Sequence, residues 1–276
     1  MPAPQKSMLA QLAKANFISK GIKLPMDWSQ PGDQYADAFA FSERIVAPNV
    51  PMNLFREATL NKYHVEAAKT IGEALEKFID GICGALCQAI DTWMKTTTIT
   101  GVLINGPVGM LIPGGVIGPP LTPLILAGAP NGTPQEFKYS GAIAMAVGTL
   151  WQPWQLGLSG TLMYPAFAVF PGPFAPPMPN VPMPLIAFAS PGEAGLSPVV
   201  LKAMMEANLA DPKALHASDL FDAIAKAFNT AFLTFKASTL IQNVLGTGPI
   251  PTFAPPFVPA GPVLGGIGTG PPGCIV

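Results

Sequence analysis

The sequence predicts a mixed fold that is mainly α-helical, with extended glycine- and proline-rich segments between its helices. Apolar residues recur at spacings of three and four in several stretches, which is typical of helices with one buried face. Charged residues are absent from 96–135, 139–192 and 237–276, and each of these tracts follows a helical pattern. Most of the 28 glycines and 33 prolines fall in the same tracts, where they disfavour further helix.

Composition limits the surfaces and partners that the chain can have. Charged residues make up 11% of the sequence, against roughly 25% in an ordinary soluble domain, and 49% of the residues are apolar. The net charge of −1 gives no long-range field that would attract nucleic acid, so no nucleic-acid partner is predicted. Cys83, Cys87 and Cys274 show no disulfide framework, and we expect the first two to be small apolar core residues.

Residues 1–59 are predicted to form an N-terminal arm with a short helix. Lysines interrupt the apolar residues of this arm before a signal-peptide core could form, so no signal peptide is predicted. The expected location is a virion or a particle assembled in the cytoplasm. The most apolar stretch, 139–170, contains Pro153 and Pro165 and is not a clean membrane-spanning helix.

Residues 60–135 are interpreted as repeat unit one, a helix followed by an uncharged, proline-punctuated strap. A stripe of apolar side chains predicts a helix over about 60–97; its members are Ile71, Leu75, Phe78, Ile82, Leu86, Ala89 and Trp93. The β-branched run 96–104 favours an extended strand or a frayed helix end. Later dipeptides such as Gly106-Pro107 predict polyproline-like or edge-like straps, not the centre of a sheet.

Residues 197–276 are interpreted as repeat unit three, with a C-terminal glycine- and proline-rich tail. Sliding the chain by 142 residues aligns 78–107 with 220–249 without a gap and gives 11 identities in 30 positions. Composition alone would give roughly two or three. Trp93 then matches Phe235 on the buried stripe, which predicts a duplicated unit.

Two helices are expected within this last unit. The first begins at Ser197, with Pro198 in its first position, and ends at about Asn208. The second is the copy of the first unit's helix, and Ser218 is its predicted N-cap.

Residues 136–196 are interpreted as a weaker third copy, repeat unit two. Sliding the chain by 81 residues matches Trp151 with Phe232 and Trp154 with Phe235, after which the phase is lost. This unit also holds the densest group of aromatic residues, which is Trp151, Trp154, Tyr164, Phe167, Phe170 and Phe174. We interpret the group as core or interface residues, and a belt in contact with lipid is the alternative.

No catalytic, cofactor-binding or metal-binding constellation is predicted. His64 and His216 have no spacing to each other or to the cysteines that is typical of a zinc site. Segment 157–161 lacks the last glycine of a nucleophile elbow and has no neighbouring acid or histidine. The glycine cluster 265–270 runs into prolines, not into a lysine and a helix, which argues against a phosphate loop. We therefore predict that the protein is not an enzyme and uses no cofactor or metal.

Uncharged apolar tracts of this length have to be buried by something. The segment 246–257, Gly-Thr-Gly-Pro-Ile-Pro-Thr-Phe-Ala-Pro-Pro-Phe, resembles proline-punctuated arms in structural proteins of phage particles and contractile injection machines. The resemblance implies a non-enzymatic structural subunit that contacts other structural subunits or copies of itself through its apolar tracts. Three units in one chain would also suit a pseudo-threefold hub on a symmetry axis. The alternative is a membrane-active or membrane-inserted protein delivered by such a machine.

Overall fold

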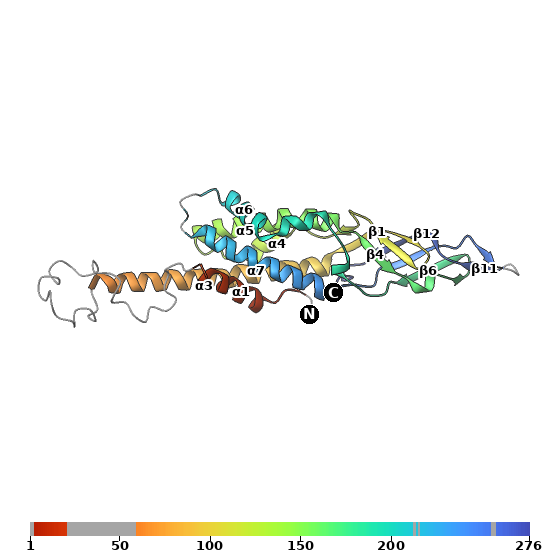
Figure 1. The fold of residues 1–276 in the computed structure, drawn as a ribbon, viewed down its shortest axis with the longest axis horizontal. Coiled ribbons are helices and arrows are strands. Elements are labelled where there is room, and N and C mark those ends of the chain that lie inside the picture. The colour runs from red at the N-terminus through yellow and green to blue at the C-terminus, as the bar shows by residue number, and fades with distance from the viewer. Residues whose placement is uncertain (1–2, 21–58, 212–213, 215, 255–257) are drawn as a thin grey trace, which may run out of the picture.

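The computed structural model describes residues 3–20, 59–211, 214, 216–254 and 258–276. The molecule is elongated, with helices in one half and strands in the other (Figure 1). The longest described helix extends past the other helices, at the end of the molecule opposite the strands (Figure 1). The molecule therefore has a helical half and a sheet half along one axis.

The helical half contains six described α-helices. They are α1 (Lys6–Ile18), α3 (Thr59–Thr96), α4 (Leu121–Gly128), α5 (Pro134–Gly157), α6 (Pro198–Leu209) and α7 (Ala217–Ser238). Three 3-10 helices are also described in the chain, η3 (Pro165–Phe167), η4 (Leu185–Ala187) and η5 (Pro191–Leu196). A capping box starts α5: the Thr133 hydroxyl accepts from the Glu136 N–H at 3.1 Å, and the Glu136 carboxylate accepts from the Thr133 N–H at 2.9 Å. Pro134 takes the first helical position, where no N–H is needed.

Two predicted helices agree with the structure, and one predicted cap does not. α3 covers the helix expected over about 60–97, and α6 covers the one expected from Ser197 to about Asn208. Ser218 is not the N-cap of α7. His216 holds that position with a left-handed φ of 60° and turns the chain directly into the helix, so Ser218 falls inside the first turn.

Helix α1 packs across α3 and α7 and belongs to the same core as both. Leu9 and Ala13 are buried there. Lys14 reaches over to α3, where its ammonium donates to Glu76 at 2.9 Å and to Asp80 at 2.8 Å. This helix lies in the predicted N-terminal arm 1–59, of which residues 21–58 are outside the described residues.

The sheet half is built around one antiparallel sheet of seven strands. Six of them follow the order β4-β2-β1-β12-β9-β6, and β3 also pairs with β1. Their bounds are β1 (Thr98–Asn105), β2 (Val108–Leu111), β3 (Val116–Ile117), β4 (Gly160–Met163), β6 (Phe174–Pro179), β9 (Leu245–Pro249) and β12 (Leu264–Gly270). Two smaller sheets are also present. One has three strands, in the order β10 (Phe253–Ala254), β11 (Val258–Gly261) and β5 (Phe170–Pro171), and the other pairs β7 (Met183–Pro184) with β8 (Leu240–Ile241).

The main sheet curls until its two outer strands approach each other. Val181, just after β6, bridges Met163 of β4, and its N–H donates to the Met163 carbonyl at 2.9 Å. Tyr164 fills the space inside the curl, and its hydroxyl donates to the Val244 carbonyl at 3.0 Å. A Cβ added to inward-facing Gly109 would lie 2.7 Å from the Tyr164 ring. Glycine therefore makes room for the aromatic filling.

The prediction of a mainly α fold with extended straps is wrong. The described residues are 55% helical and 22% strand and include the seven-stranded antiparallel sheet. The uncharged tracts supply every described strand, including those in the segments predicted as straps. The run 96–104, for which a strand or a frayed helix end was predicted, lies mostly in strand β1. Even the glycine-rich β12 lies in the middle of the sheet, between β1 and β9. Tertiary packing overrides the low strand propensity of glycine, because Gly266 and Gly268 face inward against Ile104 and Val102.

Three long helices pass into strands at positions that match the sequence offsets. α3, α5 and α7 end at Thr96, Gly157 and Ser238, and the last two of these residues are 81 positions apart. The residue that follows each helix is buried in all three cases, and these residues are Thr97, Leu158 and Thr239. The unit boundaries 60–135, 136–196 and 197–276 remain divisions of the sequence, since strands from all three lie in one sheet.

A left-handed residue marks the point where the middle copy loses its phase. Gly101 has a φ of 67° and Asn243, 142 positions later, a φ of 58°. The aligned residue of the middle unit, Leu162, lies inside β4 and has no such φ. The middle unit therefore lacks the left-handed residue that the other two units share.

Candidate interaction surface

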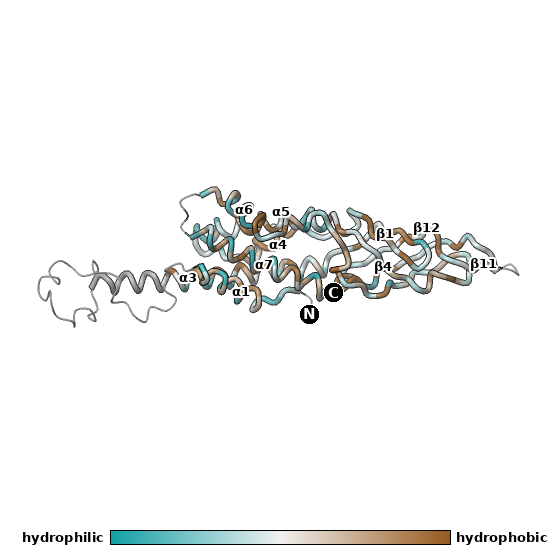
Figure 2. The backbone as a smooth tube through the Cα atoms, viewed as in Figure 1, coloured by the Kyte–Doolittle hydropathy of each residue, from teal (hydrophilic) through white to brown (hydrophobic). Residues whose placement is uncertain are grey.

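The Asp, Glu, Lys and Arg residues of the described chain all lie outside the strands. Every described strand falls within 96–135, 139–192 or 237–276, which contain no Asp, Glu, Lys or Arg. Hydrophilic segments accordingly gather in the helical half of the molecule (Figure 2). The sheet half thus has a surface without charged side chains, which is unusual for a protein that faces only water.

Apolar side chains line up on the outer face of the sheet. Register places Met110 of β2 opposite Leu103 of β1, and Leu103 opposite Ile267 of β12. The exposed fractions of these three residues are 58%, 50% and 58%. Thr161 and Thr247 continue the row at its two ends. Successive side chains of a strand point to opposite faces of the sheet. Val102 and Ile104, on either side of Leu103 in β1, therefore point inward and are buried.

A second row lies beside the first, nearer the β1–β2 turn. Val108 of β2 pairs with Met163 of β4 and with Asn105 of β1, and Asn105 pairs with Leu264 of β12. Val108, Met163 and Leu264 are all exposed. We call the two rows together the outer sheet face; its apolar members are Leu103, Val108, Met110, Met163, Leu264 and Ile267.

Further apolar side chains are exposed on the segments between β4 and α6. Val169 is 72% exposed, and Phe174 and Ile186 are each 56% exposed. The apolar exposure is thus not confined to one strand pair. Covering such a surface gains roughly 25 cal/mol for each Å² of apolar area removed from water, and no charge has to be desolvated on this side.

The cysteines offer no reactive site. Cys83 and Cys87 lie one turn apart in the buried face of α3, as predicted, and Cys274 is buried beside the Thr97 carbonyl at 3.9 Å. All three are free thiols. Burial raises the pKa of Cys87 to about 11 and that of Cys274 to about 11, and it raises the pKa of Cys83 further. Thiols with a raised pKa are poor nucleophiles at neutral pH.

The serine, glycine-rich and histidine motifs considered in the sequence also form no catalytic or binding site among the described residues. Ser159 bonds only weakly to the Ala189 carbonyl, at 3.5 Å, and segment 265–270 is strand β12 instead of a loop. His216 lies at the start of α7, whereas the side chain of His64 is outside the described residues. Among the described residues, no group of three or more His, Cys, Asp or Glu side chains could hold a metal ion.

The aromatic group of the middle unit is divided between two parts of one core, one among the helices and one inside the curled sheet, and forms no continuous belt. Trp151 and Trp154 are buried between helices, where they lie 5.2 Å and 5.8 Å from Trp93 of α3. The Trp93 indole N–H donates to the Gln155 side chain at 2.6 Å. Tyr164 and Phe167 stack at 5.3 Å inside the curled sheet, and only Phe174 of the group is strongly exposed.

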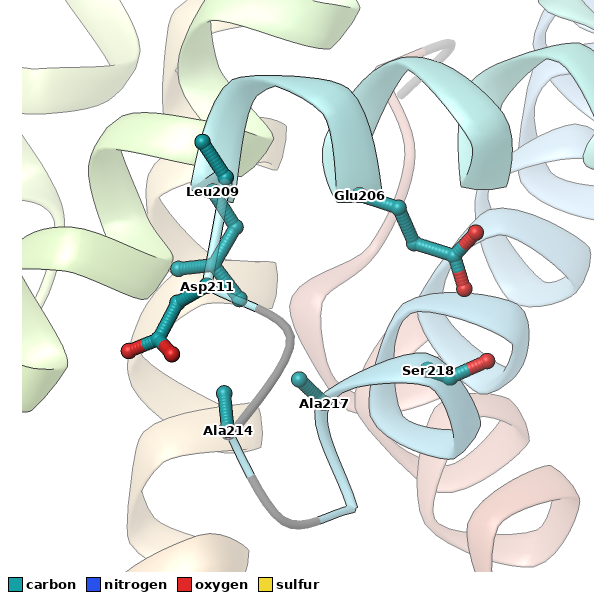
Figure 3. A pocket seen from close by; sticks show the side chains of 7 residues that line it. Glu206, Leu209, Asp211, Ala214, Ala217 and Ser218 are labelled. Carbon is teal, nitrogen blue, oxygen red and sulfur yellow. The ribbon is translucent and has the colours of Figure 1, made fainter.

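A hollow of about 400 Å³ lies between the end of α6 and the start of α7 (Figure 3). Its walls are Glu206, Leu209, Ala210, Asp211, Ala214, Ala217 and Ser218. The Glu206 carboxylate and the Ser218 hydroxyl point to one side, and the Asp211 carboxylate points to the opposite side (Figure 3). Polar groups that diverge cannot converge on one ligand, so the hollow is a weaker candidate than the outer sheet face.

No protein-family model, curated protein or solved structure matches the chain. Within the described residues, no helix is long and apolar enough to cross a membrane.

Proposed function

We propose that the protein is a non-enzymatic structural subunit of a large protein assembly, such as a phage virion or a contractile tail-like particle. The observation that carries the proposal is the outer sheet face, which is apolar, exposed and free of charge. Monomeric soluble proteins rarely expose contiguous apolar patches larger than a few hundred Å². Permanent interfaces, in contrast, resemble a domain core cut in half. The class of particle rests on the resemblance of the proline-punctuated segments to phage structural proteins.

The proposal assigns different tasks to the two halves of the molecule. The sheet half is buried against other subunits or further copies of the chain. The helical half carries the charged residues and keeps the subunit soluble before assembly, because charged surfaces oppose nonspecific association.

A charge on the outer sheet face tests this function. Met110→Lys adds an ammonium at a residue that is 58% exposed, so the isolated chain should fold normally. In the assembly the same ammonium would be buried without a partner, which costs several kcal/mol. We expect light scattering of the chain, purified together with its bound subunits from the cells that make it, to show a high-mass species for the wild type and its loss in the variant. Val199→Lys on α6, where Val199 is 78% exposed, is the matched control and should assemble normally.

The same apolar end favours one alternative, a membrane-active protein delivered by a particle of this kind. In that case the wild type would be a monomer only in detergent and would float with phosphatidylcholine vesicles, and Met110→Lys would abolish flotation. A detergent-independent assembly that does not float with vesicles would exclude this alternative. A chain recovered from the cells that make it as a detergent-independent monomer, without bound subunits, would contradict both functions.

A further inference from the structure

The strands of the three uncharged tracts alternate around the curled sheet in a threefold pattern. Each tract supplies a first strand directly or shortly after its helix and a return strand later in the chain. Within the seven-stranded sheet, the first strands are β1, β4 and β9, and the return strands are β2, β6 and β12. The two-residue strand β8, which comes before β9 in the chain, pairs with β7 in a separate sheet. Each first strand pairs with the return strand of another tract, in the pairs β1–β12, β4–β2 and β9–β6.

The ring closes because each first strand also meets its own return strand. β1 pairs with β2, β9 pairs with β12, and Met163 of β4 bridges Val181 just beyond β6. Going around the sheet, first and return strands therefore alternate without exception among these six strands. The ring thus has three parts, each made of the first strand and the return strand of one tract. We call them the three thirds of the ring.

Inward and outward side chains repeat from third to third. Val102 of β1, Leu162 of β4 and Val244, directly before β9, are buried, and the next residue in each case, Leu103, Met163 or Leu245, points outward. The exposed fractions of the outward residues are 50%, 36% and 38%. Each third thus presents an apolar, uncharged side chain at a corresponding place on the outside.

The helices that lead into the ring meet through corresponding aromatic residues. Trp93, Trp154 and Phe235 all lie three residues before the ends of their helices. Trp93 and Trp154 lie 5.8 Å apart, and Trp151 joins this pair to Phe235 at 6.2 Å. The threefold pattern therefore extends from the sheet into the core of the helical half.

We propose that the chain lies on the threefold axis of a homotrimeric partner, or of a ring whose number of identical subunits is a multiple of three. This inference rests on the proposed function and names the partner. Three similar surfaces around one axis offer similar contacts to three identical subunits, and most protein assemblies have closed rotational symmetry. Pairing with a second copy of the chain would leave most of the ring uncovered.

Charge complementarity specifies the chemistry of the partner surface. No third of the ring carries a charged residue, so a charge on the partner would be buried there without a counterion. The partner surface is accordingly uncharged and apolar, and it occurs once on each of its identical subunits.

Native mass spectrometry of the assembled complex tests the stoichiometry. The affinity-tagged full chain would be produced in the cells that normally make it, and the complex would be purified intact. The expected mass is one chain of 28.8 kDa plus three identical partner subunits, or a multiple of three. Any other ratio, including an assembly built only of this chain, overturns the threefold arrangement and leaves the proposed function standing. A chain that stays monomeric contradicts the proposed function itself.

Charge substitutions in each third provide a second, independent test. Leu103→Lys, Met163→Lys and Leu245→Lys are each expected to reduce recovery of the complex at least tenfold, because each third contacts a partner subunit. Val199→Lys on α6 should leave recovery unchanged. Circular dichroism of each purified variant shows that it still folds. If only one of the three substitutions reduces recovery, the interface is one-sided and the inference is wrong.

Discussion

Gly248 shows at the scale of one residue why the sheet needs its glycines. It faces inward from β9, and an added Cβ would lie 2.5 Å from the Gly266 Cα and 2.6 Å from a Val263 methyl group. A neighbouring backbone atom cannot move aside as a flexible side chain can. We therefore expect Gly248→Ala to lower the free energy of unfolding by about 1 to 3 kcal/mol, measured by urea denaturation.

A second glycine provides the control for this substitution. Gly141 lies in α5, and a Cβ there would have no neighbour within 4 Å. Gly141→Ala should be neutral or should stabilise the protein by up to about 1 kcal/mol, because alanine favours helix. Equal losses of stability in the two variants would contradict the close packing inferred for β9.

Trp93 and Phe235 are the matched anchors of the sequence alignment, and both are buried. Changing either one to Ala should reduce the free energy of unfolding by about 3 to 5 kcal/mol, measured by chemical denaturation. Trp93→Phe keeps most of the volume but removes the indole donor to Gln155, so it should cost about 1 to 3 kcal/mol. Unchanged stability in both alanine variants would mean that these positions are not anchors of the core.

The sequence allowed the buried helix residues to be predicted better than the residues of the sheet. The stripe that ends at Trp93 follows the helical period, and its members from Phe78 onward are buried. Residues 265–270 gave no strand signal, because glycine carries no side chain that could alternate between faces. Their strand form depends on Tyr164, Val102 and other groups that come from elsewhere in the chain.

At the scale of the element, charged contacts hold helix α1 against its neighbours. Lys20, just after α1, pairs with Asp222 of α7, and Lys226 pairs with the same carboxylate at 2.9 Å. Burial raises the pKa of Asp222, but the hydrogen bonds and charges of the two lysines outweigh burial and lower its pKa below the ordinary value. The ionised form is therefore favoured by folding.

This lowered pKa predicts how stability changes in acid. A carboxylate with a lower pKa in the folded chain stabilises it above the unfolded value of about 4, and this contribution disappears as the pH falls through the folded pKa. We expect Asp222→Asn to cost about 1 to 3 kcal/mol at pH 7 and to show a smaller loss of stability than the wild type between pH 4 and pH 2. Urea denaturation at several pH values measures both effects.

An exposed ion pair supplies the control for the acid prediction. Asp91 pairs with Lys95 one turn further along α3. Such pairs contribute little, so Asp91→Asn should change stability by less than about 0.5 kcal/mol at pH 7. If Asp222→Asn behaved like this variant, the ion pairs of Asp222 with Lys20 and Lys226 would contribute no more to stability than an exposed pair does.

Helices could be predicted from local patterns, but their termini could not always be. Proline and serine signalled the start of α6, whereas the start of α7 depends on the left-handed turn at His216. Serine at position 218 is a common N-cap residue, and nothing in the neighbouring sequence showed that the chain would already be helical there. Tertiary context selects one of several possible caps.

At the scale of the whole molecule, the separation of charged and uncharged halves determines the response to salt. Interfaces that contain ion pairs weaken as salt screens them, over a distance of about 8 Å at physiological ionic strength. The outer sheet face has no charges to screen. We therefore expect the proposed assembly to keep its mass between about 0.05 and 1 M NaCl, measured by light scattering. Dissociation at high salt would mean that the helical half forms the interface.

The arrangement of the whole sheet could not be read from the sequence. Three uncharged tracts and their offsets were visible, and they led to the prediction of straps around a possible threefold hub. Strand pairing joins residues far apart in the chain, for example Ile99 with Gly270, and no local pattern specifies such a partner. The exposed outer face could be recognised only after the pairing showed which side chains point outward.

The position of β12 between β1 and β9 has a consequence for how the protein is made. Gly265 at one end of β12 bonds to Asn105 of β1, 160 residues earlier in the chain. At a synthesis rate of about 5 to 20 residues per second, β1 waits roughly 10 to 30 s for this partner. During this interval the nascent chain exposes an apolar, unpaired strand edge, which is prone to aggregate. Production of the protein should therefore depend on chaperones that bind the chain at the ribosome.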